Sequence, residues 1–313
     1  MDGPTAIKKL QDNIELVIQG KSDAIKLAIV ALLARGHLLI EDVPGVGKTT
    51  LAHCLARSLD STFRRIQFTS DLLPSDIIGV SVYNQQQQEF EFKPGPLFSN
   101  IILADEINRT TPKTQSSLLE AMNDAQVSVD SRTYPLPQPF MVVATQNPME
   151  YQGTYPLPES QLDRFMMRLR IGYPSEADEK KILQTPQSFH PAEGIKPVLT
   201  GPEVTKLQSQ VTRVLVDDTL VDYLLAIVTA TRQSERLGLG ASTRAAMSLY
   251  KAAQALAFVE GRNYCLPDDF KYLAPYILSH RVIINGRFDA FGRRSQDAEQ
   301  IILELVEEIP VPL

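Results

Sequence analysis

The chain has 313 residues, of which 43% are hydrophobic and 22% are charged. These fractions match ordinary globular proteins, so they exclude a disordered, collagen-like or coiled-coil protein and predict one large domain or two smaller ones. The net charge of −6 disfavours an obligate nucleic-acid-binding protein, whose affinity depends on clustered Lys and Arg.

The cysteines and the apolar windows bear on the cellular location. Cys54 and Cys265 lie far apart and lack the spacing of a metal site or a disulfide framework. The first residues carry scattered charges, so no secretion signal is expected. The most apolar window, Ile25 to Ile40, contains charged residues and is shorter than the roughly 20 residues of a spanning helix. We therefore predict a cytoplasmic protein with no membrane span.

The first part of the chain alternates between helical and strand patterns. Two amphipathic helices are predicted at residues 4–18 and 22–34, because apolar residues recur at steps of three and four. Four apolar runs of strand length follow, HLLIE, FRRIQF, NIILA and FMVVAT, with helical stretches such as 48–58 and 112–123 between them. This alternation predicts an α/β fold with a parallel sheet, and such sheets bind ligands at the carboxyl ends of their strands.

After residue 172 the strand patterns give way to helical ones. Five segments with helical periodicity follow, at residues 176–183, 203–214, 217–236, 242–260 and 267–279. A stretch rich in Pro, Gly and Ser at 185–202 predicts a loop. The predicted organisation is therefore an α/β domain at 1–172 and a smaller all-helical domain at 173–313.

A glycine-rich motif, DVPGVGKT, follows the run HLLIE directly and opens into a helix. Gly45 and Gly47 would let backbone amides surround phosphate oxygens, and the helix N-terminus adds its positive dipole. Lys48 could reach the β- and γ-phosphates, and the Thr49 hydroxyl could bind Mg²⁺. Because Asp42 replaces the first glycine of the usual G-x-x-x-x-G-K-[ST] pattern, a plain strand–turn–helix is the alternative for this motif alone.

Two later runs also end in polar residues. Asp105 and Glu106 follow NIILA, where a metal ion on the phosphates would pair with Asp105 and Glu106 could orient the attacking water. Asn147 follows FMVVAT and could bind the γ-phosphate or that water. Alone, an acidic pair is more often a solvated strand end and Asn-Pro a turn. Together with the glycine-rich motif, they predict a nucleotide site.

The ordered motifs DVPGVGKT, ILADEINR, ATQNP, LDRF and GASTRA resemble those of the MoxR family of AAA+ ATPases, and the similarity covers nearly the whole chain. The resemblance implies a P-loop AAA+ αβα sandwich with a parallel sheet at 1–172 and a smaller all-helical lid domain at 173–313. It implies ATP and Mg²⁺ as cofactors, with Thr49 and Asp105 on the metal. The implied nucleotide-binding residues are Pro44, Gly45, Val46, Gly47, Lys48, Thr49 and Thr50.

The same resemblance implies roles in hydrolysis for four residues. Glu106 activates water, and Asn147 is the first sensor of the γ-phosphate. Arg164 of LDRF is the arginine finger that reaches a neighbouring subunit's nucleotide, with Arg168 in reserve, and Arg244 of GASTRA is the second sensor. An arginine supplied in trans can contribute a factor of roughly 10³ to 10⁵ in rate. Hydrolysis would then require assembly, and a hexameric ring is the family's arrangement.

Two insertions, Tyr83 to Phe92 and Val127 to Leu136, resemble hairpins that face the ring pore in relatives. The resemblance implies a chaperone-like protein that remodels or matures protein complexes, with protein clients and a von Willebrand factor A domain protein as a partner. A nucleic-acid-translocating AAA+ motor is the alternative. It is disfavoured because the second insertion has one basic residue, Arg132, opposed by Asp130.

A third hypothesis is a nucleotide-gated binding scaffold that hydrolyses ATP too slowly to do work. The presence of Glu106, Asn147 and Arg164 disfavours it, because a scaffold needs none of them.

Overall fold

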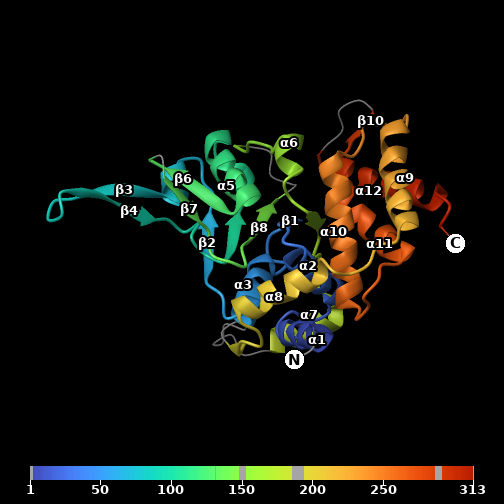
Figure 1. The fold of residues 1–313 in the computed structure, drawn as a ribbon, viewed down its shortest axis with the longest axis horizontal. Coiled ribbons are helices and arrows are strands. Elements are labelled where there is room, and N and C mark those ends of the chain that lie inside the picture. The colour runs from blue at the N-terminus through green and yellow to red at the C-terminus, as the bar shows by residue number, and fades with distance from the viewer. Residues whose placement is uncertain (1–2, 131, 148–152, 185–193, 286–290, 313) are drawn as a thin grey trace.

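The computed structural model describes residues 3–130, 132–147, 153–184, 194–285 and 291–312 (Figure 1). Its centre is a five-stranded sheet in the order β2-β5-β8-β1-β9, and every neighbouring pair is parallel. All five strands therefore leave the sheet at one edge, as the apolar runs predict. The strands are β1 (Leu38–Glu41), β2 (Phe63–Gln67), β5 (Ile101–Asp105), β8 (Met141–Gln146) and β9 (Met167–Leu169).

Helices lie on both faces of this sheet. Figure 1 shows α5 on one side of the strands and α2 and α3 on the other. The predicted bounds agree closely, since α3 spans the expected residues and α5 extends one residue further. The helices of this part are α1 (Gly3–Glu15), α2 (Ser22–Leu33), α3 (Lys48–Ser58), α4 (Pro74–Ile78), the 3₁₀ turn η1 (Ile107–Arg109), α5 (Pro112–Asp124), α6 (Glu159–Leu162) and α7 (Glu176–Gln184).

The side chains of the central strands alternate between two hydrophobic cores. In β1, Leu38 and Ile40 belong to the core that includes α1, α2 and α3, whereas Leu39 belongs to the core that includes α5. In β5, Leu103 likewise belongs to the first of these cores and Ala104 to the second. Successive residues of a strand point to opposite faces, so a strand that is apolar throughout must be covered on both. The predicted αβα sandwich is confirmed.

The last part of the chain forms a helical lid beside β9. Its helices α10 and α11 join the same hydrophobic core as α1 and α2. One short antiparallel pair, β10 (Leu237–Leu239) with β11 (Ile283–Ile284), adds a strand element to the lid that was predicted as all-helical. The helices are α8 (Gly201–Val211), α9 (Asp218–Gln233), α10 (Thr243–Val259), α11 (Pro267–Leu278) and α12 (Phe291–Glu308).

Helix α8 lies between the two parts of the molecule. Gln208 of α8 donates a hydrogen bond from Nε2 to the carbonyl of Leu32 in α2, at 2.7 Å, and α8 also contacts α10. The predicted domain boundary at residue 172 stays a prediction, because α8 contacts α2, which precedes that boundary, and α10, which follows it. The predicted loop at 185–202 lies partly outside the described residues, and its end, from Gly201, is the start of α8.

Both predicted insertions form antiparallel hairpins. The long hairpin, β3 (Gly79–Asn84) with β4 (Glu89–Pro94), projects from the body of the molecule (Figure 1). The short hairpin is β6 (Gln126–Val129) with β7 (Arg132–Pro135). The rings of Phe92 and Tyr134 stack at 4.4 Å, and Ser81 donates a hydrogen bond to Asp130. The two hairpins therefore support each other where the long one leaves the body.

Across the described parts of the chain, every helix is too short or too polar to cross a membrane.

The buried side chain of His37 connects three elements at the amino edge of the sheet. Its Nδ1 accepts a hydrogen bond from the amide of Val142, at 3.0 Å, so its Nε2 carries the proton and donates to the carbonyl of Met122, at 2.9 Å. Burial lowers the pKa of His37 to about 4. The folded protein therefore holds this imidazole neutral.

This depressed pKa predicts loss of stability in mild acid. Because the folded pKa lies below the usual value of 6.5, the unfolded chain binds more protons between pH 6.5 and 4, and stability falls as the pH falls through that interval. The contribution of His37 is about 3 kcal/mol at most. Urea unfolding at several pH values should show a shallower decline for His37→Gln than for the wild type. Equal declines would contradict the role of His37.

Candidate active site

The glycine-rich loop connects β1 to the N-terminus of α3. Gly45 and Gly47 have φ angles of 87° and 93°, in the left-handed region that favours glycine, and no atom lies within 4 Å of where a Cβ would stand on either. Glycine is therefore needed for the backbone conformation rather than for lack of space. The loop leaves a concave backbone surface at the N-terminus of an 11-residue helix, which is a favourable position for an anion.

Asp42 has a structural role that the sequence did not reveal. Its Oδ2 accepts hydrogen bonds from the amides of Ile171, at 2.7 Å, and Gly172, at 2.6 Å, and its Oδ1 accepts one from the amide of Val43. The Nζ of Lys48 donates to the Asp42 carbonyl, at 2.7 Å. Asp42 thus fastens the start of the loop to the chain that follows β9, which the usual glycine could not do.

Replacing this carboxylate should destabilise the fold. Asp42→Ala removes a buried acceptor of three backbone hydrogen bonds, and the expected loss in free energy of unfolding is about 3 kcal/mol. Urea unfolding of Asp42→Ala can be compared with Asp222→Ala, a change at an exposed aspartate of α9. Similar losses of free energy of unfolding in the two variants would show that the hydrogen bonds of Asp42 do not stabilise the fold.

The loop and the predicted acidic residues line one cavity of about 380 Å³. Asp105 ends β5, Glu106 follows it, and Asn147 directly follows β8, so the parallel register carries all three to the edge where the loop begins. Val46 is the exception, because its side chain packs in the core. The complete lining is Pro44, Gly45, Gly47, Lys48, Thr49, Thr50, Arg65, Asp105, Glu106 and Asn147.

Both carboxylate oxygens of Asp105 have partners in the protein. Arg65 of β2 donates to Oδ2 from Nε, at 3.0 Å, and from Nη2, at 2.6 Å. The hydroxyl of Thr145 donates to Oδ1, at 2.6 Å. Asp105 and Thr49 line the same cavity, and carboxylate and hydroxyl oxygens suit Mg²⁺. The residues therefore fit the implied metal, with Arg65 already beside one of its ligands.

Glu106 adopts a conformation that is unusual for its residue type. Its φ and ψ angles are 57° and 50°, in the left-handed region, and its amide donates to the hydroxyl of Thr145. Its Oε2 accepts a hydrogen bond from Gln67 of β2, at 2.8 Å, and lies 3.4 Å from a guanidinium nitrogen of Arg109. Such strained positions concentrate at functional sites. The carboxylate of Glu106 is held at the cavity that also contains Lys48.

The predicted finger, Arg164, lies at the opposite edge of the sheet. It precedes Met167 by three residues, and Met167 pairs with Leu38, the first residue of β1. Its Nη1 donates to the carbonyl of Leu119 in α5, at 2.6 Å, while its Nε is buried without a hydrogen-bond partner among the described residues. Arg164 is therefore separated from the loop of its own subunit by the length of a strand, on the order of 10 Å.

Arg244 lies near Arg164 rather than near the glycine-rich loop. Its guanidinium is 4.0 Å from the carboxylate of Asp163, which also accepts hydrogen bonds from Ser242 and pairs with the buried Arg281. Asp163 thus joins the LDRF segment to the start of α10. Among the described residues, Arg164 and Arg244 are thus linked only through Asp163, the residue before Arg164, and neither arginine lines the cavity of the loop.

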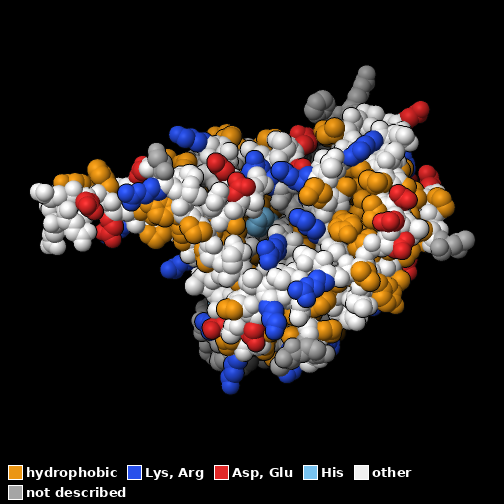
Figure 2. All heavy atoms as spheres, viewed as in Figure 1, with side chains coloured by type: hydrophobic (Ala, Val, Ile, Leu, Met, Phe, Trp, Pro, Cys, Tyr) orange, Lys and Arg blue, Asp and Glu red, His pale blue; other side chains and the backbone are white. Residues whose placement is uncertain are grey.

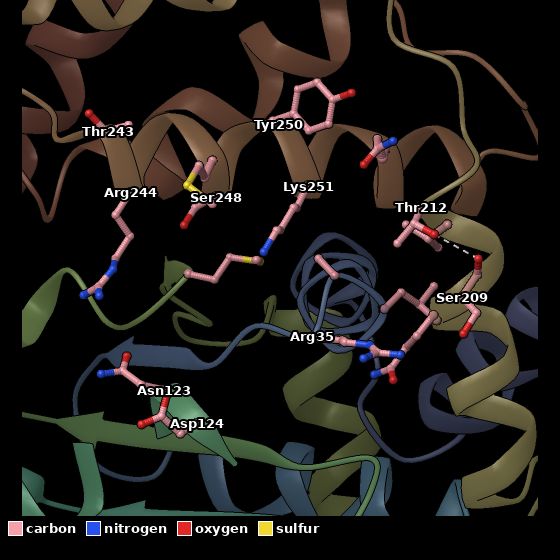
Figure 3. A pocket seen from close by; sticks show the side chains of 17 residues that line it. Arg35, Asn123, Asp124, Ser209, Thr212, Thr243, Arg244, Ser248, Tyr250 and Lys251 are labelled. Atoms are coloured by element: carbon pink, nitrogen blue, oxygen red, sulfur yellow. Dashed lines mark hydrogen bonds between the residues drawn. The ribbon is translucent and has the colours of Figure 1, made fainter. Parts of the chain in front are cut away.

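Arg244 lines a second cavity, of about 960 Å³, between the lid and the amino edge of the sheet. Figure 3 shows Arg244 and Lys251 extending from α10 toward this space, with Arg35, Asn123 and Asp124 across from them. Figure 2 shows several basic side chains between α5 and α10 near the centre of that view. We call this site the amino-edge cavity, and its lining has three basic residues and one acidic residue.

The reserve role of Arg168 as arginine finger stays a prediction, and the structure shows where this residue lies. Its side chain is 5% exposed, forms an ion pair with Glu41 at 3.4 Å, and donates to the hydroxyl of Ser279 at 2.9 Å. Arg168 is in the middle of β9, between β1 and the lid, so its side chain is enclosed within its own subunit. It links the sheet to the lid.

Three site residues were missed by the sequence analysis, namely Arg65, Gln67 and Thr145. Each acts on Asp105 or Glu106 from a neighbouring strand, so the contact depends on the order of strands in the sheet. The sequence did contain a signal for Arg65 and Gln67. Polar residues at 65 and 67 in an otherwise strand-like run share a face, and their strand ends at the functional edge.

Comparisons with known proteins agree with this geometry. Residues 37–167 match the model of the ATPase family associated with various cellular activities (AAA), and residues 229–305 match the AAA lid domain. The uncharacterised protein YeaC of Bacillus subtilis is 50% identical over 97% of this chain and 94% of its own. Chaperone MoxR1 of Mycobacterium tuberculosis is 40% identical over 96% and 80%. The crystal structure of a candidate ATPase from Cytophaga hutchinsonii, 38% identical, superposes with a TM-score of 0.89 over 99% and 96%.

The five-stranded parallel sheet, the glycine-rich loop and the helical lid define an AAA+ ATPase. Within that class, the similarity along nearly the whole chain identifies the family. The chain belongs to the MoxR family of AAA+ ATPases.

Proposed function

We propose that this ATPase hydrolyses ATP with Mg²⁺ at the interfaces of a ring of subunits and uses the hydrolysis to remodel or mature protein complexes. The observation that carries the proposal is the division of site residues between two edges of one sheet. The glycine-rich loop, Asp105 and Glu106 lie at the carboxyl edge, and Arg164 and Arg244 lie at the amino edge. A complete site then needs two subunits.

The residues of the carboxyl edge have separate roles in the proposal. Lys48 and the amides of the loop bind the β- and γ-phosphates, and Thr49 and Asp105 hold Mg²⁺, which would neutralise charge on the phosphates. Glu106 orients the attacking water, and Asn147 fixes the γ-phosphate or that water by its amide. Charge that develops on the transferred group is stabilised by Arg164 of a neighbouring subunit.

The division also bears on the symmetry of the assembly. A patch at one edge that must meet a different patch of another copy gives head-to-tail contacts, which close into a ring or continue as a filament. We favour a ring, and a hexamer is the number we propose from the family. The amino-edge cavity, with Arg35, Arg244 and Lys251, would face the nucleotide edge of the next subunit, where phosphates and acidic residues concentrate.

Proteins are the proposed clients, and the long hairpin is the part that would grip them. Val80, Val82, Tyr83 and Phe90 are exposed on it, with Phe90 71% exposed. The basic residues of the two hairpins, Lys93 and Arg132, are outnumbered by the acidic residues Glu89, Glu91 and Asp130. A hairpin that binds the phosphate backbone of a nucleic acid needs more basic than acidic residues. The nucleic-acid motor is therefore the weaker hypothesis, and the name Chaperone MoxR1 of a relative supports the stronger one.

A von Willebrand factor A domain protein is the proposed partner, by the resemblance to the MoxR family. A cytoplasmic location is supported by Cys54 and Cys265, which are buried and not joined to each other, as expected in a reducing compartment.

The proposal is tested by the steady-state ATPase rate at increasing protein concentration, with Mg²⁺ and with a chelator. Specific activity should rise with concentration and require Mg²⁺, since the site is completed by assembly. Activity that is independent of concentration down to dilutions where sizing detects only monomers would contradict catalysis between subunits.

Removing the water-orienting carboxylate should separate binding from turnover. Glu106→Gln should bind ATP as well as the wild type and lower kcat by about 10²- to 10⁴-fold, the range for loss of a general base. ATP binding is measured by calorimetry and turnover by phosphate release. Glu120→Gln, at an exposed glutamate of α5, is the matched control. Turnover in Glu106→Gln that equals the control would refute the role of Glu106.

Subunit mixing tests the role of Arg164. Arg164→Ala should bind ATP normally and hydrolyse it roughly 10³-fold or more slowly. When this variant is mixed in equal amounts with Glu106→Gln, roughly one interface in four has both residues, so activity should return above that of either variant alone. Arg213→Ala, at an exposed arginine after α8, should behave as the wild type. An inactive mixture that still forms rings would show that Arg164 does not act in trans.

A further inference from the structure

Arg65 contacts Asp105, the residue that would bind the metal ion. In the parallel pairing of β2 with β5, Arg65 lies beside Leu103 and Gln67 lies beside Asp105. From that register its guanidinium reaches along the face of the sheet and donates twice to Oδ2 of Asp105, at 2.6 and 3.0 Å. A bond by two nitrogens to one carboxylate oxygen is a charge-assisted contact. Arg65 is therefore a specific partner of Asp105.

A cation bound at Asp105 would compete with that contact. The other carboxylate oxygen, Oδ1, accepts from the hydroxyl of Thr145, so neither oxygen is without a donor. Mg²⁺ and a guanidinium repel each other when they share one carboxylate. Arg65 can move away more easily than Asp105, since its side chain is 50% exposed whereas that of Asp105 is 12% exposed.

Arg65 also lines the cavity of the glycine-rich loop, together with Lys48 and Thr49. A guanidinium released from Asp105 would thus remain in the space that the phosphates of a nucleotide would fill. Phosphate groups attract it by charge and by bidentate geometry. No role in binding or hydrolysis was expected for this residue from the sequence.

We propose that Arg65 is the exchangeable counterion of Asp105. It neutralises that carboxylate until a metal ion takes its position, and it then turns toward the phosphates. The proposal rests on the ATP- and Mg²⁺-dependent function proposed above. Its consequence is that Arg65 makes Mg²⁺-free nucleotide easier to bind, because Asp105 would otherwise repel the phosphates, and makes Mg²⁺ alone harder to bind.

The test compares ATP binding by calorimetry in EDTA and in Mg²⁺ for the wild type, Arg65→Gln and Arg64→Gln. Arg64 is the adjacent exposed residue of β2, on the opposite face, and serves as the matched control. In EDTA, Arg65→Gln should bind ATP about two- to fivefold more weakly than the wild type, the range for a partly exposed ion pair. In Mg²⁺ the loss should be smaller, so the gain in affinity from Mg²⁺ should increase. Arg64→Gln should match the wild type in both buffers.

A second readout does not use nucleotide. Mg²⁺ alone should raise the Tm of Arg65→Gln more than that of the wild type or of Arg64→Gln, because no guanidinium competes for Asp105. Arg65→Lys keeps the charge and should return both readouts toward the wild type. Should Arg65→Gln fail to fold, Arg65→Lys and Arg65→Met provide the same comparison of a charged with an uncharged side chain.

Each result has a defined meaning. Equal weakening of ATP binding in EDTA and in Mg²⁺ would make Arg65 an ordinary phosphate ligand and overturn the exchange. Unchanged binding and an unchanged response to Mg²⁺ would overturn it as well. If the wild type binds ATP and Asp105→Asn removes the gain from Mg²⁺ while Arg65→Gln preserves it, the proposed function stands and only the role of Arg65 fails. A wild type that binds no ATP in either buffer would contradict the proposed function itself.

Discussion

The parallel register of the five central strands is the constraint on which the rest of the molecule depends. Because every strand runs in the same direction, every loop that follows a strand begins at the carboxyl edge. The glycine-rich loop after β1, the acidic pair at and just after the end of β5, and Asn147 after β8 therefore line one cavity, although they are far apart in the sequence. The same constraint sends the segment before β9, with Asp163 and Arg164, to the other edge.

Contacts between strands then determine the environment of each site residue. Asp105 is held by Arg65 from one neighbouring strand and by Thr145 from the other, and Glu106 is held by Gln67 and by the same threonine hydroxyl. The two acidic side chains are thus oriented by residues of β2 and β8 rather than by their own strand. At the amino edge, Asp163 connects the LDRF segment to α10, so the position of the lid and that of Arg164 are related.

The sequence predicted what depends on local pattern and on family motifs. It gave the bounds of α3 and α5 nearly to the residue, because each begins at a clear signal, Lys48 after glycine and Pro112 after threonine. It did not reveal Arg65 or Gln67, whose partners lie about 40 positions away and are met only when β2 and β5 pair. Asp42 was taken as a departure from a pattern, and its function appears only once β9 lies beside β1. Arg168 was considered for a surface role because one sequence does not distinguish an interior arginine from an exposed one.

The left-handed backbone of Glu106 has a consequence for how this protein can change over generations. A residue with a Cβ pays about 1 kcal/mol or more to adopt that conformation, and glycine does not. Selection for heat resistance alone would thus tend to replace Glu106 by glycine, and under the role proposed for Glu106 the resulting molecules would be more stable but would no longer turn over nucleotide. On that proposal, retention of a glutamate at this position is expected only in lineages where turnover itself is under selection.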